Sequence, residues 1–201
     1  MKTSIKPHAC CRYKQGPIDC ILRIMEEHQL SAKAIEKITI SVLKAGFALV
    51  ADPADFKRNP ASIVDAQFSM PFGAAIAVLH GNASLDQYCL EHIKSPAVKE
   101  IMSRVYCVED PLIEEEFPKK WPAHVEIVTV DGKKYCAAID YPKGDPENPL
   151  SWDEIILKFK NLVAPVLSTD KQDHIIHQVR ELETMSDLSE FMDGLIIKDF
   201  P

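Results

Sequence analysis

Cysteine and histidine side chains near the start of the chain are the first groups whose chemistry could include metal binding. Residues 10–28 contain Cys10, Cys11, Cys20 and His28. A tetrahedral zinc site usually draws on closely spaced ligand pairs such as CxxC or HxxxH, and these four residues lack that spacing. The sequence therefore predicts no metal site at this end of the chain.

Two histidines near the other end, His174 and His177, lie three residues apart on an expected helix. This spacing suits a metal, but no third ligand is evident in the sequence, so we interpret both side chains as helix surface. The common catalytic signatures GxGxxG, GxxxxGK[ST], GxSxG and HExxH do not occur in the sequence. Residue types alone thus predict a soluble α+β domain and no particular reaction.

Hydrophobic periodicity indicates the elements that must position these residues. Residues 15–28 have apolar side chains at helical spacing with Pro17 in the expected first turn, and residues 37–42 alternate as a half-buried strand does. The alanine-rich stretch 63–79 predicts one buried helix that ends at Gly81. Further helices are expected at 84–92 and 96–102, a second strand at 104–108, and turn-like segments at 52–60, 109–122 and 141–150.

The clearest local signal is a β-hairpin. Residues 125–130 and 135–139 are strand-like, and Asp131-Gly132 between them favours the positive backbone angles of a two-residue turn. Neighbouring strands are therefore expected to be antiparallel.

The fold class follows from how these elements are distributed. Beyond Ser151, which begins a capping box with Glu154, the chain has helical periodicity to its end. Strands are few and helices come in blocks, which is typical of an α+β fold. We predict a small antiparallel sheet with helices in residues 1–150 and C-terminal helices in residues 151–201.

Composition and charge exclude several classes of protein. The chain has 23 basic and 30 acidic residues, a formal net charge of -7, and no basic tract. A nucleic-acid partner is not expected from such a charge distribution. Neither the polar segment Met1–Gln15 nor the longest apolar run, residues 72–79, suits a signal peptide or a membrane span. We therefore expect a cytoplasmic protein with free cysteines and no membrane partner.

Four stretches together resemble a known family. They are residues 6–11 (KPHACC) followed by Ile18-Asp19, residues 65–72 (DAQFSMPF) with the alanine-rich helix, the hairpin at 125–139, and residues 142–151 (PKGDPENPLS). In this order and spacing they resemble the C-terminal portion of MmgE/PrpD proteins, which include 2-methylcitrate dehydratase and cis-aconitate decarboxylase. The resemblance extends from about Lys6 to Gly194.

The resemblance implies a fold and a chemistry. It implies an α+β lid domain that closes over an active site, and C-terminal helices that pack on a separate helical domain. The implied reaction is proton abstraction beside a carboxylate, with loss of water or carbon dioxide from a tricarboxylate and without a cofactor. Such an elimination needs a base, a proton donor and cations that hold the carboxylates. Most of those residues belong to the family's N-terminal half, so no catalytic residue is assigned here.

The resemblance also implies five substrate-binding candidates. Lys6 corresponds to a lysine that faces substrate in decarboxylase-like members, where its ammonium suits a carboxylate. His8 lies in the same segment, Cys11 stands where those members have a histidine, and Phe72 stands where a tyrosine is common. Ser69 completes the set, either within the site or as the cap of the adjoining turn. We predict that Lys6, Ser69 and Phe72 line one concave surface; the alternative is a solvated lysine, with Ser69 and Phe72 in the core.

Two functions follow as hypotheses. The first is the C-terminal part of a tricarboxylate lyase that is inactive alone. The second is a free-standing α+β module that binds small carboxylates or a separate helical subunit. Both hypotheses include a small carboxylate ligand, and the apolar faces of the tail helices predict a homo-oligomer or a helical partner domain.

Overall fold

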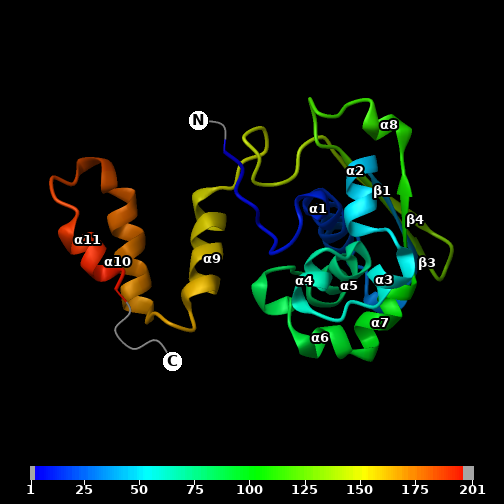
Figure 1. Ribbon diagram of the computed structural model, residues 1–201, viewed down its shortest axis with the longest axis horizontal. Helices are drawn as coiled ribbons and strands as arrows, with labels where there is room; N and C mark the ends of the chain where they lie inside the picture. The colour runs from blue at the N-terminus through cyan, green and yellow to red at the C-terminus, as the bar shows by residue number, and fades with distance from the viewer. Residues whose placement is uncertain (1–2, 197–201) are drawn as a thin grey trace. The chain divides into compact units, whose positions relative to one another are not determined.

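The computed structural model describes residues 3–196, and the chain divides into two compact units, residues 1–149 and residues 150–201 (Figure 1). The first unit contains the sheet and most of the helices, and the second is helical. An α+β fold is confirmed.

Four strands form the sheet of the first unit, in the order β2-β1-β3-β4. They are β1 (Ile35–Val42), β2 (Val105–Glu109), β3 (Ala123–Thr129) and β4 (Lys134–Ile139). The β1–β3 and β3–β4 pairs are antiparallel, but β1 and β2 are parallel. The expectation that all neighbouring strands are antiparallel is therefore wrong for one pair. The physical reason is the long helical crossover between β1 and β2, which returns the chain to the same end of the sheet.

The predicted hairpin is present in β3 and β4. Residues of β3 alternate between buried and half-buried, which matches a strand with one face on the core. Gly132 has a φ of 79°, a left-handed angle that favours glycine, and its amide donates to the carbonyl of Thr129 at 2.8 Å. The amide of Thr129 donates to the carbonyl of Lys133, so the loop has three residues and not the expected two.

Helices α1 (Arg12–Glu27) and α5 (Met70–His80) form the centre of the core, where they pack on each other and α1 covers β3 and β4 (Figure 1). Pro17 was expected in the first turn of this helix. Because α1 begins at Arg12, Pro17 instead lies inside the helix. Three short helices form in segments where the sequence predicted no helix. They are α2 (Lys44–Val50), α3 (Ala54–Arg58) and α8 (Pro111–Glu114).

The stretch predicted as one helix at 63–79 is two helices, α4 (Ile63–Gln67) and α5, separated at Phe68 and Ser69. Ser69 has an extended conformation, and its hydroxyl accepts a hydrogen bond from the amide of Phe72. A serine at this position satisfies an amide that the first turn of a helix leaves without a partner, which is why the chain breaks here. Gly81 ends α5 with a left-handed φ of 62°, as expected.

The remaining helices of the first unit agree broadly with the sequence. The predicted helix at 84–92 is a short 3-10 turn, η2 (Leu85–Gln87), followed by α6 (Leu90–Lys94), and α7 (Pro96–Ser103) forms as expected. A further 3-10 turn, η1 (Ala32–Ala34), precedes β1.

The second unit consists of α9 (Trp152–Val163), α10 (Thr169–Arg180), a 3-10 turn η3 (Leu182–Thr184) and α11 (Ser189–Gly194). α9 begins with the predicted capping box, in which Ser151 and Glu154 exchange hydrogen bonds. No helix within residues 3–196 is long and apolar enough to cross a membrane.

Candidate functional site

The segment that contains Lys6, His8 and Cys11 is held on the first unit by main-chain hydrogen bonds. The amide of Ile5 donates to the carbonyl of Gly144 at 2.9 Å, and the amide of Ala9 donates to Ala83 at 3.0 Å. The amide of Cys11 donates to the carbonyl of Gln67 at 3.1 Å. Residues 5–11 thus lie against three parts of the chain that are far apart in sequence.

Gln15, a fully buried residue of α1, fixes the middle of this segment. Its Oε1 accepts from the amide of His8 at 3.1 Å, while its Nε2 donates to the carbonyls of His8 and Cys10 at 3.1 and 3.2 Å. A buried amide that is satisfied in this way restricts the segment to one conformation. The backbone at His8 is therefore preorganised by the first helix.

His8 itself is 8% exposed, and its Nε2 lies 2.9 Å from Oδ1 of Asp19 on α1. The other carboxylate oxygen of Asp19 accepts from the amide of Lys143 at 2.8 Å. Asp19 therefore fixes the imidazole on one side and the 142–145 loop on the other. Asp19 belongs to one of the motifs that carry the family resemblance, but the sequence did not predict its contacts with His8 and Lys143.

Lys6 and Arg12 lie on either side of His8 in the chain. Lys6 is exposed, and its Nζ lies 3.4 Å from the carbonyl of Cys10. Arg12 Nη2 is 2.5 Å from Oδ2 of Asp145, a buried residue of the same loop. The structure thus links Arg12 directly, and His8 through Asp19, to the 142–145 loop, while the Lys6 ammonium lies beside the N-terminal segment itself.

Ser69 and Phe72 are not on this surface. Both are fully buried, so the prediction that they share a concave surface with the exposed Lys6 is wrong. Ser69 caps α5 and also donates to the carbonyl of Lys57, and the Phe72 ring packs against Tyr88 with centroids 5.6 Å apart. The expectation that the two residues share a helix face is also wrong, because Ser69 is the extended residue that caps α5 and only Phe72 lies in the helix.

The two motifs nevertheless meet, through Gln67. Its carbonyl accepts from the amide of Cys11, and its Nε2 donates to the carbonyl of Ala9 at 3.0 Å. The half-buried Cys11 is thereby fixed beside the end of α4. A substrate-binding role for Lys6, His8, Cys11, Ser69 and Phe72 stays a prediction.

A buried lysine, Lys14, was missed in the sequence. It is fully buried in α1, and its ammonium donates to the carbonyls of Ala66 and Gln67 at 2.9 and 3.3 Å and to the Tyr88 hydroxyl at 3.3 Å. Burial lowers the pKa of Lys14 to about 8. Its position in the apolar stripe with Ile18 was the available signal.

Lys14 holds the end of α4 against α1. The last carbonyls of a helix lack partners within the helix, and a cation near them is favourable. Because the Gln67 carbonyl also accepts from Cys11, Lys14 indirectly supports the N-terminal segment. We interpret Lys14 as a structural residue of the site, since its ammonium is not accessible to a ligand.

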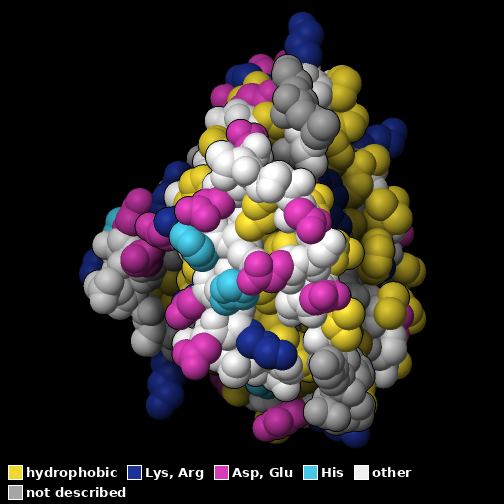
Figure 2. All heavy atoms as spheres, turned by 90° about the vertical axis from the view of Figure 1, so that its left-hand side faces the viewer, with side chains coloured by type: hydrophobic (Ala, Val, Ile, Leu, Met, Phe, Trp, Pro, Cys, Tyr) yellow, Lys and Arg dark blue, Asp and Glu magenta, His cyan; other side chains and the backbone are white. Residues whose placement is uncertain are grey.

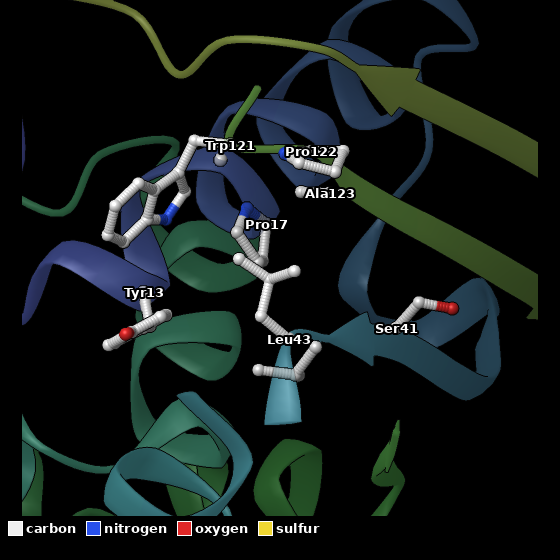
Figure 3. Close-up of a pocket in the computed structure, with 9 residues that line it drawn as sticks. Tyr13, Pro17, Ser41, Leu43, Trp121, Pro122 and Ala123 are labelled. Atoms are coloured by element: carbon white, nitrogen blue, oxygen red, sulfur yellow. The ribbon is translucent and has the colours of Figure 1, made fainter. Parts of the chain in front are cut away.

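A small pocket lies beside this region, between α1, the end of β1 and the start of β3 (Figure 3). Its walls include Tyr13, Pro17, Leu43 and Trp121, and none of the nine residues that line it is charged. The indole nitrogen of Trp121 is buried and has no hydrogen-bond partner among residues 3–196. The pocket therefore suits a water molecule or a small apolar group with one acceptor atom, and not a carboxylate.

The second unit has a different electrostatic character. Within residues 150–196 there are nine acidic and four basic residues, which gives a formal charge of -5. Figure 2 shows acidic side chains spread over the face of the molecule that it presents. His174 and His177 are exposed on α10 as expected. Across residues 3–196, no group of three His, Cys, Asp or Glu side chains is arranged to hold a metal ion.

Comparison with known proteins agrees with the resemblance stated above. The family model of the MmgE/PrpD C-terminal domain matches residues 8–184. The cis-aconitate decarboxylase-like protein oryM of Aspergillus oryzae is 27% identical over 201 residues, which cover 94% of this chain and 39% of the relative. The cis-aconitate decarboxylase of Mus musculus is 24% identical over 143 residues, which cover 70% of this chain and 29% of the relative. The chain thus spans well under half the length of either relative.

Proposed function

Because this chain belongs to the MmgE/PrpD family and matches its C-terminal domain, we propose that it is the carboxylate-binding C-terminal part of a lyase. The proposed substrate is a small tricarboxylate, as for 2-methylcitrate dehydratase or cis-aconitate decarboxylase. We also propose that the chain alone has no turnover. The six free cysteines suit a cytoplasmic location, which is part of the proposal.

The observation that carries the proposal is the group of basic side chains around the N-terminal segment. Lys6 is exposed there, and His8 and Arg12 are held in place by Asp19 and Asp145. A tricarboxylate needs several fixed cations, because its charges repel each other and are well solvated in water. The acidic second unit is a poor alternative position for such an anion, so we assign the site to the first unit.

The proposed lack of turnover rests on the chemistry that an elimination requires. A base must remove a proton beside a carboxylate, and a donor must protonate the leaving group where one is expelled. The described site supplies cations and one imidazole whose Nε2 is already engaged with Asp19. We therefore expect the base to come from the part of the relatives that this chain does not span.

A titration with tricarballylate, a tricarboxylate that cannot undergo the elimination, tests the binding site. We expect amide NMR shifts at residues 5–12 and 142–145, and an affinity reduced about tenfold in Lys6→Ala, because one charge-assisted contact is lost. Lys33→Ala is the matched control, since Lys33 is exposed just beyond the opposite end of α1. Shifts confined to other residues, or equal weakening in both variants, would contradict the proposal.

Turnover is tested separately with cis-aconitate and 2-methylcitrate. The purified chain is expected to release neither carbon dioxide nor water from these acids above the rate without protein. Measurable turnover that Lys6→Ala abolishes would show that the chain carries its own base. Binding without turnover is also what the alternative function, a free-standing carboxylate-binding module, predicts. The mass of the protein from its native source separates the two functions: a longer native chain supports the lyase, whereas a stable native product of this length that co-purifies with a partner supports the module.

Association with a helical partner or a second copy is a further part of the proposal. The second unit exposes large apolar side chains, including Trp152, Leu157, Leu162, Met192 and Ile196. Exposed apolar surface of this kind is typical of interfaces. We expect sedimentation velocity to show a dimer or larger species, and a monomer at high concentration would contradict self-association.

A further inference from the structure

Arg12 is held by two side chains of the first unit, Asp145 and Trp121. Its Nη2 is 2.5 Å from Oδ2 of Asp145, whose side chain is 5% exposed. Its guanidinium carbon lies 4.8 Å from the centre of the Trp121 ring. A planar guanidinium that is stacked on an indole and paired with a buried carboxylate keeps one orientation.

The surroundings of Trp121 are themselves rigid. The indole packs between the rings of Tyr13 and Phe117, whose centroids are each 5.1 Å from its own. The main-chain amide of Trp121 donates to the carbonyl of Asp140 at 2.9 Å. The surface against which Arg12 stacks is thus fixed by α1 and by the segment before β3. Arg12 does not have to be ordered by a ligand, which lowers the entropic cost of binding one.

Arg12 also keeps donors for a ligand. Among residues 3–196 its side chain makes one hydrogen bond, to Asp145, whereas a guanidinium has five N–H groups. The side chain is 24% exposed, so part of it reaches solvent. The unused N–H groups lie in the plane of the guanidinium, and two of them side by side can donate to the two oxygens of one carboxylate.

The 142–145 loop binds both the backbone next to Lys6 and the side chain of Arg12. The carbonyl of Gly144 accepts from the amide of Ile5, the residue before Lys6, and the next residue, Asp145, pairs with Arg12. The left-handed φ of Gly144, 89°, brings the Ile5 carbonyl so close that a side chain would not fit. The backbone that carries Lys6 and the side chain of Arg12 are thus held by adjacent residues of one loop.

We propose that Arg12 binds a second carboxylate of the ligand that Lys6 binds, and that Asp145 and Trp121 are positioning residues for it. The inference rests on the proposed function and adds a requirement for at least two carboxylates. A ligand with one carboxylate engages only one of the two cations. The site therefore distinguishes tricarboxylates from acids with one carboxylate because Lys6 and Arg12 each bind a carboxylate, and not through Lys6 alone.

Calorimetry with tricarballylate and acetate tests this inference in the whole chain. Arg12→Ala is expected to weaken tricarballylate binding tenfold or more and to reduce the preference for tricarballylate over acetate. Because Arg12→Ala also removes the ion pair with Asp145, Arg12→Lys is the second variant. It retains the charge but lacks the planar donors, and we expect it to weaken tricarballylate binding about tenfold while its thermal melt stays close to that of the unchanged chain.

The outcomes separate this inference from the proposed function. If Lys6→Ala weakens tricarballylate binding but Arg12→Lys binds as tightly as the unchanged chain, the role of Arg12 is wrong and the carboxylate site stands. If the unchanged chain does not bind tricarballylate, both proposals are wrong. Lys33→Ala again serves as the control for a general effect of charge.

Discussion

Replacement of Gly73 by alanine is expected to destabilise the first unit through Lys14. A methyl group on Gly73 would lie 2.5 Å from Cε and 3.0 Å from Nζ of Lys14, and 3.3 Å from Cδ1 of Ile18. The lysine side chain is fully buried and donates to the carbonyls of Ala66 and Gln67. It therefore has no solvated position to which it can move without losing those bonds.

The magnitude follows from three opposing contributions. Alanine in place of glycine inside a helix gains about 1 kcal/mol. Crowding in a packed core costs about 1 to 3 kcal/mol, and a weakened hydrogen bond from a charged donor costs about 1.5 to 3 kcal/mol. We expect Gly73→Ala to lower the free energy of unfolding by about 2 to 4 kcal/mol. In a Lys14→Ala background the main clash is absent, so Gly73→Ala should be neutral or stabilise by up to about 1 kcal/mol.

Urea unfolding of the four proteins in this double-mutant cycle measures the coupling between the two positions. The fluorescence of Trp121 reports on the first unit, provided that Trp152 of the second unit is replaced by phenylalanine in all four. The expected coupling is about 3 kcal/mol, with a change of sign in the effect of Gly73→Ala. An equal effect of Gly73→Ala in both backgrounds would refute the assigned contact.

Three further predictions concern titration and reactivity. Folding lowers the pKa of Lys14 from the ordinary lysine value of 10.5 to about 8. The unfolded chain therefore binds more protons between pH 8 and pH 10.5, and stability rises with pH over this interval. The stability of the unchanged chain minus that of Lys14→Met should thus rise by about 3 kcal/mol from pH 7 to pH 11, and no rise would contradict it. Burial and the charge of the neighbouring His92 lower the pKa of His80, so the folded chain loses stability as pH falls through that pKa. An NMR titration should show a higher pKa of His80 in His92→Ala. Ellman's reagent should modify the exposed Cys136 rapidly and Cys20 only on unfolding, because burial raises the pKa of Cys20 to about 12; equal rates would contradict this.

Most of the local structure of the first unit was predictable from short patterns. The hairpin, the strand at β1 and the glycine that ends α5 depend on neighbouring residues, and all are present. The parallel pairing of β1 and β2 was not predictable, because the choice of partner depends on how the intervening helices pack and not on either strand alone.

The candidate site was predictable only in part. The pattern that includes Lys6 and His8 located the segment. The three-residue spacing of Ser69 and Phe72 did not show that Ser69 caps the helix from outside, nor that both side chains are buried. Lys14 was overlooked because an isolated lysine is normally exposed. The partners Asp145 and Trp121 are more than 100 residues from Arg12, and no local pattern connects them.

The parallel pairing of β1 and β2 also has a consequence for the order in which the chain folds. Residue Ile38 pairs with Val105, a separation of 67 positions, whereas Val128 pairs with Lys134 across a loop of a few residues. Closing a long loop is slow and entropically costly, so contacts of high sequence separation form late. We expect the β3–β4 hairpin to form first and the edge strand β2 to dock last, after the helical crossover has collapsed on α1. During synthesis and refolding, the open edge of β1 is then the surface most exposed to aggregation.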